Sequence, residues 1–267
     1  MNYQGKALTI AGSDSGGGAG IQADLKTFAA FSVFGMSAVT SVTAQNTTGV
    51  RAIYDLSPEI IEEQIEAVME DIGVDAIKTG MLSNSTIVQL VADKIRKYGV
   101  ARLVVDPVMV AKGGSKLLDE PARKTLAEEL LPLAYLVTPN VFEAEIISGL
   151  GIKNVKDAER AALLIYERGG RNVLIKGGHL PTEKATDILF DGDRYYYYES
   201  ERLDTRNTHG TGCTLSAAIT AGLAKGQHIR QAIEVAKDYV YRAINDAPNN
   251  IGRGHGPLYH NTRPRRY

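Results

Sequence analysis

The sequence predicts an α/β protein with a mostly parallel central sheet, helices on both faces and a small hairpin. Short apolar runs alternate along the chain with longer segments in which apolar residues recur every three to four positions. Near its last third, two β-prone runs are joined by Asp191-Gly192-Asp193, a turn sequence that favours a hairpin. The chain has 267 residues and no repeat or low-complexity linker, so we expect one domain over 1–267.

The expected elements follow from these patterns in chain order. Strands are predicted over 6–11, 36–44, 75–78, 102–106, 135–138, 172–176, 186–190 and 194–198. Helices are predicted over 21–34, 58–72, 85–98, 120–131, from about 140, over 156–168, from 213 and over 229–247. The tyrosines at 195–198 are interpreted as a half-exposed strand, and the tail from 248, with His228 and His260, is expected at the surface.

Composition excludes several classes of function. The 30 Lys and Arg residues against 31 Asp and Glu residues give a formal net charge of −1, which argues against capture of nucleic acid or anionic membrane. One cysteine excludes an internal disulfide framework and an all-thiolate metal site, and it fits a reducing compartment. The apolar run at 7–11 is too short for a signal peptide, and the uncharged stretch 27–50 suits a buried helix and strand better than a membrane span. We therefore expect a cytoplasmic protein.

The segment 206–224 changes from a polar, glycine-bearing loop into a run of small and apolar residues. Gly210 and Gly212 leave bare N–H groups at the expected helix start, where a helix attracts anions. A helix N-terminus lowers a thiol pKa from about 8.5 toward roughly 3.5–7.5, so Cys213 is expected to supply a thiolate near neutral pH. The alternative is a cysteine that is only a small buried hydrophobe.

Polar residues follow most of the predicted strands. In open α/β sheets, ligands bind beyond the carboxyl ends of the strands, so this pattern indicates a cleft and favours an enzyme. The residues concerned are Ser13, Asp14, Gln45, Lys78, Thr79, Asp106, Thr138, Asn140 and Lys176.

The glycine-rich stretch 12–20 follows a strand and opens a helix. It loosely matches a dinucleotide fingerprint, but about twenty residues on, where that motif wants an acid, the chain has Thr43-Ala-Gln45. The sequence contains no P-loop motif. A mobile flap over a small ligand and a tight structural turn both remain open.

Asn140 and Glu143 offer hard oxygen ligands of the kind that Mg²⁺ prefers, although a helix cap with an acidic first turn explains them as well. Lys176 is either a phosphate ligand or a solvated turn lysine, and Asp106 either a ligand or a turn former. Taken together, these features indicate phosphoryl transfer from a nucleotide. They are the anion site, the base, the lysine, the pair that can bind magnesium and the glycine flap.

The chain also resembles a known family along nearly its whole length. The motifs that carry the resemblance lie at 11–26, 43–46, 76–81, 105–109, 138–144, 175–178 and 209–213. It resembles the hydroxymethylpyrimidine/phosphomethylpyrimidine kinases of thiamine biosynthesis, in the ribokinase-like superfamily and close to the pyridoxal kinases. The resemblance implies a ribokinase-like fold, ATP, Mg²⁺, two successive phosphorylations of the pyrimidine, and a homodimer.

The resemblance also implies roles for single residues. Cys213, where ribokinase relatives usually carry aspartate, is the expected base, and vitamin B6 activity stays open as the alternative. The N–H groups of Gly210, Thr211 and Gly212 hold developing charge, and Lys176 bridges the phosphates. The remaining expected contacts are Thr211 and Asn140 for the nucleotide, Glu143 with Asn140 for Mg²⁺, Asp106 as a further metal ligand, and Gly12, Gly18, Met81 and Val108 for the substrate.

Gln45 favours the pyrimidine over pyridoxal on physical grounds. Its carboxamide complements the amino and ring-nitrogen edge of an aminopyrimidine, which pyridoxal lacks. Asp24, if it turns inward, accepts from the substrate, and otherwise it is a solvated helix acid. A ligand sensor that kept a kinase fold and a Rossmann-type oxidoreductase are the competing hypotheses.

Overall fold

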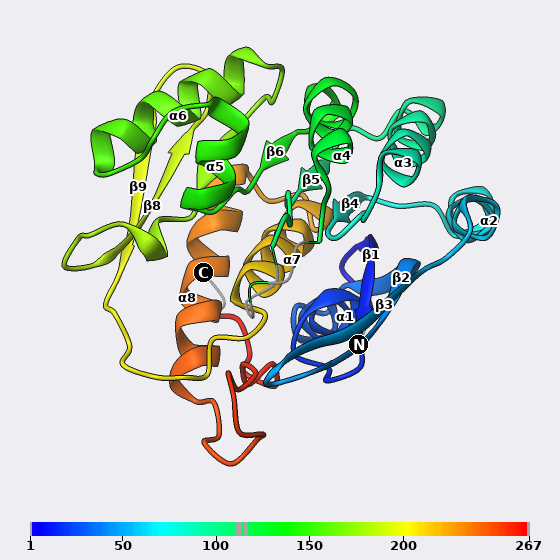
Figure 1. Cartoon of the computed structure of the whole chain (residues 1–267). Helices are drawn as coiled ribbons and strands as arrows, with labels where there is room; N and C mark the ends of the chain where they lie inside the picture. Colours follow the sequence, from blue (N-terminus) through cyan, green and yellow to red (C-terminus); the bar gives the residue numbers. More distant parts are fainter. Residues whose placement is uncertain (1, 111–113, 115–116, 266–267) are drawn as a thin grey trace.

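The computed structural model describes residues 2–110, 114 and 117–265 of the chain. Its described strands form one sheet in the order β3-β2-β1-β4-β5-β6-β7-β8-β9 (Figure 1). The five pairings from β2 through β1 to β7 are parallel, and β3, β8 and β9 run antiparallel to their neighbours. The strands are β1 (Lys6–Asp14), β2 (Phe34–Asn46), β3 (Gly49–Asp55), β4 (Ala76–Thr79), β5 (Leu103–Val105), β6 (Leu136–Val137), β7 (Val173–Ile175), β8 (Ala185–Phe190) and β9 (Tyr195–Ser200).

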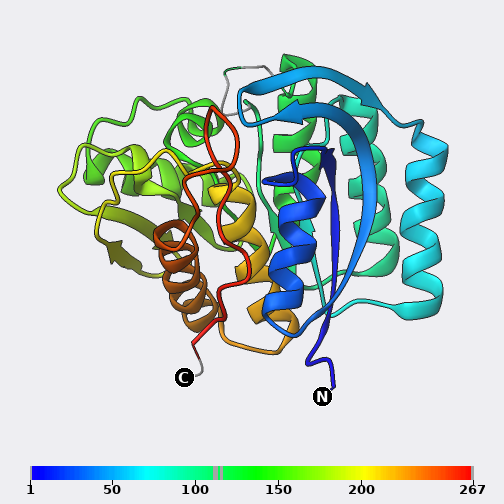
Figure 2. The same ribbon diagram turned by 90° about the horizontal axis from the view of Figure 1, so that it is seen from below.

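Helices cover both faces of this sheet, as the sequence predicts (Figure 2). On one face lie α1 (Gly20–Ala30), α7 (Thr211–Ala224) and α8 (Ile229–Asn245). The other face carries α2 (Pro58–Ala67), α3 (Ser85–Tyr98), α4 (Glu120–Thr125), α5 (Val141–Ser148) and α6 (Val155–Glu167). None of the helices in the described part of the chain is long and apolar enough to cross a membrane.

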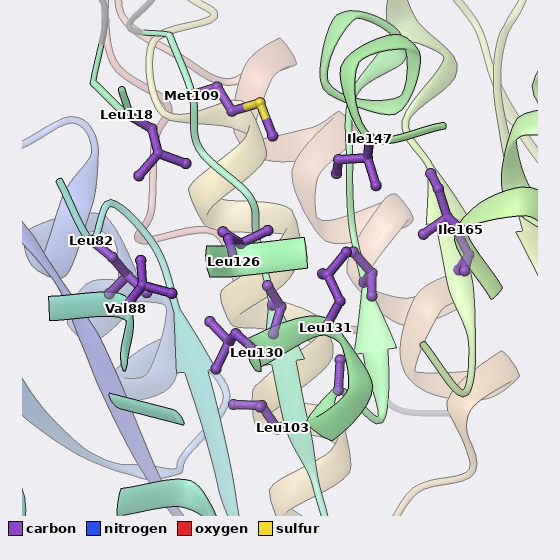
Figure 3. Packing of buried hydrophobic residues seen from close by; sticks show 14 of the residues in the cluster. Leu82, Val88, Leu103, Met109, Leu118, Leu126, Leu130, Leu131, Ile147 and Ile165 are labelled. Atoms are coloured by element: carbon purple, nitrogen blue, oxygen red, sulfur yellow. The ribbon is translucent and has the colours of Figure 1, made fainter. Parts of the chain in front are cut away.

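Alternation along the strands divides the core into two clusters. In β5, Leu103 and Val105 face the layer of α2 to α6, whereas Val104 faces α1, α7 and α8. Figure 3 shows the first cluster, in which Leu103 meets side chains from the helical segment around Leu126 and Leu130. Both faces of each central strand are therefore buried, which explains their continuous apolar runs.

Several element boundaries differ from the prediction. The helix expected over 21–34 ends at Ala30 because Ser32 takes a left-handed backbone (φ 59°), after which β2 begins at Phe34. The helices expected over 58–72 and 120–131 begin as predicted, but each continues as a π-helical turn, at Val68–Ile72 and Leu126–Leu130. Strand β3 was not predicted, because this exposed edge strand has no buried apolar alternation.

The hairpin of β8 and β9 is confirmed, and its tyrosines form a half-exposed strand. The prediction of a surface tail is wrong for His260, which is buried, whereas His228 is exposed as expected. The ring of His260 lies 3.0 Å from the Thr214 hydroxyl, and the hydroxyl of Tyr239 donates to its carbonyl. Burial lowers the pKa of His260 to about 4.

Candidate active site

A turn closed by glycine opens helix α7. Gly210 has a left-handed backbone (φ 84°), and Thr211 is the first residue of the helix. A Cβ atom at Gly210 would lie 1.8 Å from the carbonyl oxygen of Gly18, so only glycine fits there. Among the described side chains none caps this helix, so no side-chain oxygen competes with an anion for its first N–H groups. We call Gly210, Thr211 and Gly212 the anion turn.

The loop 15–19, here called the glycine loop, packs on the anion turn. Asp14, the last residue of β1, holds it closed. Its Oδ1 accepts from the N–H of Gly16 (2.8 Å), and its Oδ2 accepts from those of Gly18 (3.1 Å) and Ala19 (2.8 Å). Oδ2 also lies 2.8 Å from Nε2 of His209. Burial alone would raise the pKa of Asp14, but the hydrogen bond with His209 helps to lower it.

Lys176 follows the last residue of β7 and reaches the anion turn. Its Nζ lies 2.7 Å from Oδ1 of Asp106 and 3.9 Å from Oε2 of Glu143. A Cβ atom at Gly212 would lie 3.2 Å from the same Nζ. Burial alone would lower the pKa of Lys176, but the two carboxylates raise it, so the lysine is charged. The ammonium group and the helix N-terminus therefore meet at one point.

Asp106 is the counter-ion of this lysine. Its Oδ1 also accepts from the hydroxyl of Thr138 (3.3 Å), and its Oδ2 accepts from that of Ser216 (3.1 Å). Burial opposes ionisation, but Lys176 and Lys78 keep the pKa of Asp106 below its ordinary value. Because protein donors already bind both oxygens, Asp106 fits poorly as a direct magnesium ligand. Within residues 2–110, 114 and 117–265, no group of three or more His, Cys, Asp or Glu side chains could hold a metal ion.

Asn140 and Glu143 form the capping box of α5. Oδ1 of Asn140 accepts from the N–H of Glu143 (3.0 Å), and Oε2 of Glu143 accepts from the N–H of Asn140 (2.8 Å). The capping interpretation is thus confirmed. Burial raises the pKa of Glu143 to about 7, with Lys176 opposing the rise. A carboxyl group that titrates near neutrality beside the lysine still fits the chemistry of a magnesium–nucleotide site, with water between metal and protein.

Cys213 lies half-buried in the first turn of α7, directly after the anion turn. Burial raises the pKa of its thiol to about 11, although Lys78 and the N–H of Gly20 act in the opposite direction. This direction is opposite to the one expected for a cysteine at a helix N-terminus. Loss of hydration has a larger effect on the thiol than Lys78 and the N–H of Gly20, which is the first residue of α1.

Asp24 has neither of the roles expected of it. Its side chain is fully buried under the sheet, where Oδ2 binds Nζ of Lys78 (2.7 Å) and the hydroxyl of Thr9 (2.6 Å). Burial raises the pKa of Asp24 although Lys78 opposes the rise, whereas Asp24 raises the pKa of Lys78 against burial, so the lysine is charged and its ammonium group binds the Asp24 carboxyl group directly. With no exposed surface, Asp24 cannot contact a substrate in this conformation, and it is not a solvated acid either.

The expected substrate residues lie around the ends of β1 and β2. A Cβ atom at Gly12 would come within 2.6 Å of Cε of Met81, and one at Gly18 within 2.5 Å of the His209 ring. Gln45 is half-buried, and Nε2 of its amide lies 3.3 Å from Nε2 of His209. Sequence reasoning missed the pairing of His209 with Asp14, although both residues lie in motifs that it singled out.

One expected substrate contact, Val108, is linked to this group only through the backbone, because its N–H donates to the carbonyl oxygen of Asp106 at 2.8 Å. Val108 is half-buried beyond β5, two residues after Asp106. An open cavity of about 1160 Å³ lies elsewhere, between β9 and α8, and Tyr195–Tyr198 and Arg230 are among its lining residues. None of the predicted site residues lines that cavity.

Comparison with known proteins places this geometry in a family. The family model described as phosphomethylpyrimidine kinase matches residues 14–259. The hydroxymethylpyrimidine/phosphomethylpyrimidine kinase of Bacillus subtilis (strain 168) is 52% identical over 256 residues, which cover 96% of this chain and 94% of that protein. The enzyme of the same name from Haemophilus influenzae is 49% identical over 265 residues, covering 97% of this chain and 98% of that protein.

Solved structures agree with this assignment. A Bacillus subtilis pyridoxal kinase in an ADP complex has a TM-score of 0.90 at 44% identity, covering 97% of this chain and 98% of that chain. Phosphomethylpyrimidine kinase from Clostridium difficile 630 has a TM-score of 0.81 at 49% identity, covering 90% of this chain and 99% of that chain. These neighbours confirm the ribokinase-like fold, and the chain is a kinase that belongs to the phosphomethylpyrimidine kinase family.

Proposed function

We propose that this chain transfers the γ-phosphoryl group of ATP to the hydroxyl of 4-amino-5-hydroxymethyl-2-methylpyrimidine and then to the resulting monophosphate, in thiamine biosynthesis. The observation that carries the proposal is the meeting of the Lys176 ammonium with Gly212 of the anion turn, directly before Cys213. The names of the most similar relatives support the substrate. The proposal treats 1–267 as one catalytic domain, which the continuous sheet supports.

To bind the phosphates and transfer the phosphoryl group, the protein has to position the reacting groups and neutralise their charge. Phosphoryl transfer has a loose transition state in which charge spreads over the oxygens of the transferred group. In the proposal, the N–H groups of Gly210, Thr211 and Gly212 donate to these oxygens, and Lys176 bridges the phosphates. An incoming phosphate would compete with Asp106 and Glu143 for the lysine, so the resting ion pairs hold the ammonium ready for the nucleotide.

The nucleotide is ATP with Mg²⁺, which neutralises phosphate charge when it is bound. A solved pyridoxal kinase from Staphylococcus aureus, 37% identical to this chain with a TM-score of 0.89, contains AMP-PCP and pyridoxal. In the proposal, Glu143 holds the magnesium ion through water, and Asn140 contributes its amide while it caps α5. Asp106 positions Lys176 and does not bind the metal directly.

Cys213 is the base in this proposal. Because its pKa is high, the reaction depends on the few molecules in which the thiol is deprotonated. Burial raises the pKa of the thiol to about 11, so only a small minority of molecules carries the thiolate at neutral pH. The thiolate of this minority takes the proton of the attacking hydroxyl. Lys78 stabilises it, since Lys78 lowers the pKa that burial raises.

Gln45 selects the pyrimidine by bidentate pairing, and Gly12, Gly18, Met81 and Val108 complete the substrate contacts of the proposal. A pyridoxal or pyridoxine kinase is the second candidate function. The match to the Bacillus subtilis pyridoxal kinase over 97% of this chain favours it specifically. The homodimer and the cytoplasmic location stay predictions.

One assay separates these functions. ADP release is measured with hydroxymethylpyrimidine, its monophosphate, pyridoxine and pyridoxal as acceptors. We expect the two pyrimidines to be the better substrates, and Cys213→Ala to lose far more than twofold in turnover. Preference for pyridoxine by the wild type would support the second function, and no ADP release with any acceptor would support a ligand sensor.

The contribution of Gln45 has its own test. Gln45→Met removes the donor and the acceptor while keeping a side chain of similar length. We expect a loss of about 1–3 kcal/mol in transition-state binding for the pyrimidine and a smaller loss for pyridoxine. Equal losses for both acceptors would remove the selective pairing from the proposal.

A further inference from the structure

The carboxamide of Gln45 lies between two groups that restrict its orientation. Its Oε1 is 3.1 Å from the hydroxyl oxygen of Thr43, and its Nε2 is 3.3 Å from Nε2 of His209. The two ends of an amide have nearly the same size, so hydrogen bonding decides which end faces which neighbour. Counting the protons on Thr43 and His209 therefore reveals the preferred orientation.

The proton count at His209 starts from Asp14. Oδ2 of Asp14 accepts from two backbone N–H groups and lies 2.8 Å from Nε2 of His209. An ionised carboxylate only accepts hydrogen bonds, so this ring nitrogen carries a proton. A protonated Nε2 cannot accept from an amide N–H. Its single proton goes to Asp14, so of the two ends of the Gln45 amide only the oxygen, which can share that proton, fits beside His209.

The hydroxyl of Thr43 favours the same orientation of the Gln45 amide. Its hydroxyl has one proton, which it donates to the carbonyl oxygen of Ser13 at 2.8 Å. Toward Gln45, the hydroxyl oxygen then offers only a lone pair. It therefore requires an N–H group from the amide.

We propose that Thr43 and the Asp14–His209 pair are positioning residues that hold the Gln45 amide with Oε1 toward His209 and Nε2 toward Thr43. This inference rests on the proposed function, because it assigns the direction in which the aminopyrimidine binds. Each end of the amide keeps one free site for a ligand: a lone pair on the oxygen and an N–H on the nitrogen.

The held orientation matters because the substrate is not symmetric. In the pyrimidine, the amino group stands between a ring nitrogen and the carbon that bears the hydroxymethyl group. Pairing the amino group with Oε1 and the ring nitrogen with Nε2 puts the amino group on the His209 side. The hydroxymethyl group then lies on the His209 side and away from Thr43, and the anion turn directly follows His209 in the chain. The opposite amide orientation would put the hydroxymethyl group on the Thr43 side.

The protonation of His209 is tested first, without reference to activity. Nitrogen-15 NMR of the histidine rings is recorded at pH 8, with His209→Gln used to assign the signals. We expect Nε2 of His209 to show the shift of a protonated nitrogen. An unprotonated Nε2 would overturn the inference, whether or not the chain phosphorylates any acceptor.

Kinetics test the consequence for the substrate. Thr43→Val removes the acceptor for the amide N–H but keeps the shape, and Thr43→Ser keeps the hydroxyl. We expect Thr43→Val to lower kcat/KM for hydroxymethylpyrimidine about threefold to tenfold, mainly through kcat, because part of the substrate binds the wrong way round. Thr43→Ser should restore most of this loss.

Pyridoxine is the internal control, because it lacks the amino and ring-nitrogen edge. Thr43→Val should change its turnover by less than about twofold. Equal losses for both acceptors, or no rescue by serine, would overturn the inference and indicate a merely structural threonine. Absence of pyrimidine phosphorylation by the wild type would instead refute the proposed function, while the NMR result still decides the amide orientation.

Discussion

Two buried lysine–aspartate pairs in this molecule have the same chemistry but different surroundings. In both, Nζ lies 2.7 Å from a carboxylate oxygen, in Lys78–Asp24 and in Lys176–Asp106. The first pair is sealed, with no exposed surface on either side chain, whereas Lys176 keeps 14% of its side chain exposed. A sealed ion pair cannot bind a ligand, and it acts on neighbouring groups such as the Cys213 thiol only through its electric field. An ion pair that is open on one side can also exchange a carboxylate for a ligand.

The positions of the two lysines in the sheet explain the difference. Lys78 lies inside β4, opposite Thr9 of β1 and Val104 of β5, so neighbouring strands flank it on both sides. Lys176 comes directly after β7, at the carboxyl edge where α/β proteins bind ligands. We conclude that the position along the strand, more than the residue type, separates the candidate phosphate ligand from the buried counter-charge.

The largest expected effect concerns the sealed pair. Lys78→Met leaves the carboxylate of Asp24 buried without its partner, which typically costs about 3–5 kcal/mol. We expect this loss in the free energy of unfolding, measured by urea denaturation. Asp24→Leu combined with Lys78→Met should recover most of it, because an apolar pair leaves no charge to compensate. A single variant as stable as the wild type would refute the structural role of the pair.

Substitution in the open pair, Lys176–Asp106, should lower the catalytic activity. Lys176→Met removes a donor to the transferred group, and losses of this type are about 10²–10³-fold in kcat. Its free energy of unfolding should fall less than that of Lys78→Met, because Asp106 keeps its hydrogen bonds from Thr138 and Ser216. ADP-release kinetics and urea denaturation of the same samples check both parts. Full turnover in this variant would contradict the role of Lys176.

A smaller effect distinguishes the hydroxyl groups that support the two pairs. Thr9→Val removes a hydrogen bond to the buried carboxylate of Asp24, which should cost about 1.5–3 kcal/mol of stability. Ser216→Ala should cost less stability, because that hydroxyl also contacts the carbonyls of Gly212 and Cys213 and its donation to Asp106 is long. We expect Ser216→Ala to lower kcat severalfold and Thr9→Val to leave kcat of the folded enzyme unchanged. If Thr9→Val lowered kcat and Ser216→Ala did not, the distinction between the sealed and the open pair would be wrong.

The last prediction concerns the ionisation of the Cys213 thiol, whose pKa the sealed pair influences. If the thiolate is the base, kcat/KM should rise with pH, because the deprotonated fraction grows tenfold per unit until the pH reaches the pKa of about 11. The rise corresponds to about 1.4 kcal/mol per pH unit. A pH–rate series from 7 to 10 measures it, with Cys213→Ala as the variant that should lose the slope. A flat wild-type profile would exclude a thiolate base.

Much of the site was predictable because its parts are local in sequence. The glycines before α7, the Asn140–Glu143 capping box and the polar residues after each strand are short patterns with a direct structural meaning. The shared edge of a parallel sheet then implied that Lys176 and Gly212 would lie close together, and they do. Asp106 was correctly placed at that edge, but its role as the counter-ion of Lys176, supported by a hydrogen bond from the distant Ser216, was not predicted.

The errors share one cause. Asp24, His260 and Cys213 were judged from their neighbours in the chain, whereas their environments come from distant segments. Asp24 lies on the buried face of α1 and meets Lys78 from β4. His260 lies in a polar, glycine-rich tail but packs against Thr214 of α7.

The sequence by itself determined the alternation of strands and helices, the helix caps, the glycine positions and the edge of the sheet that carries chemistry. Each of these depends on a few consecutive residues. Only the tertiary structure decided which lysine is sealed, which groups lie beside the Gln45 amide, and that burial raises the pKa of the Cys213 thiol. Burial and buried charge are sums over segments far apart in the chain, so no local pattern reports them.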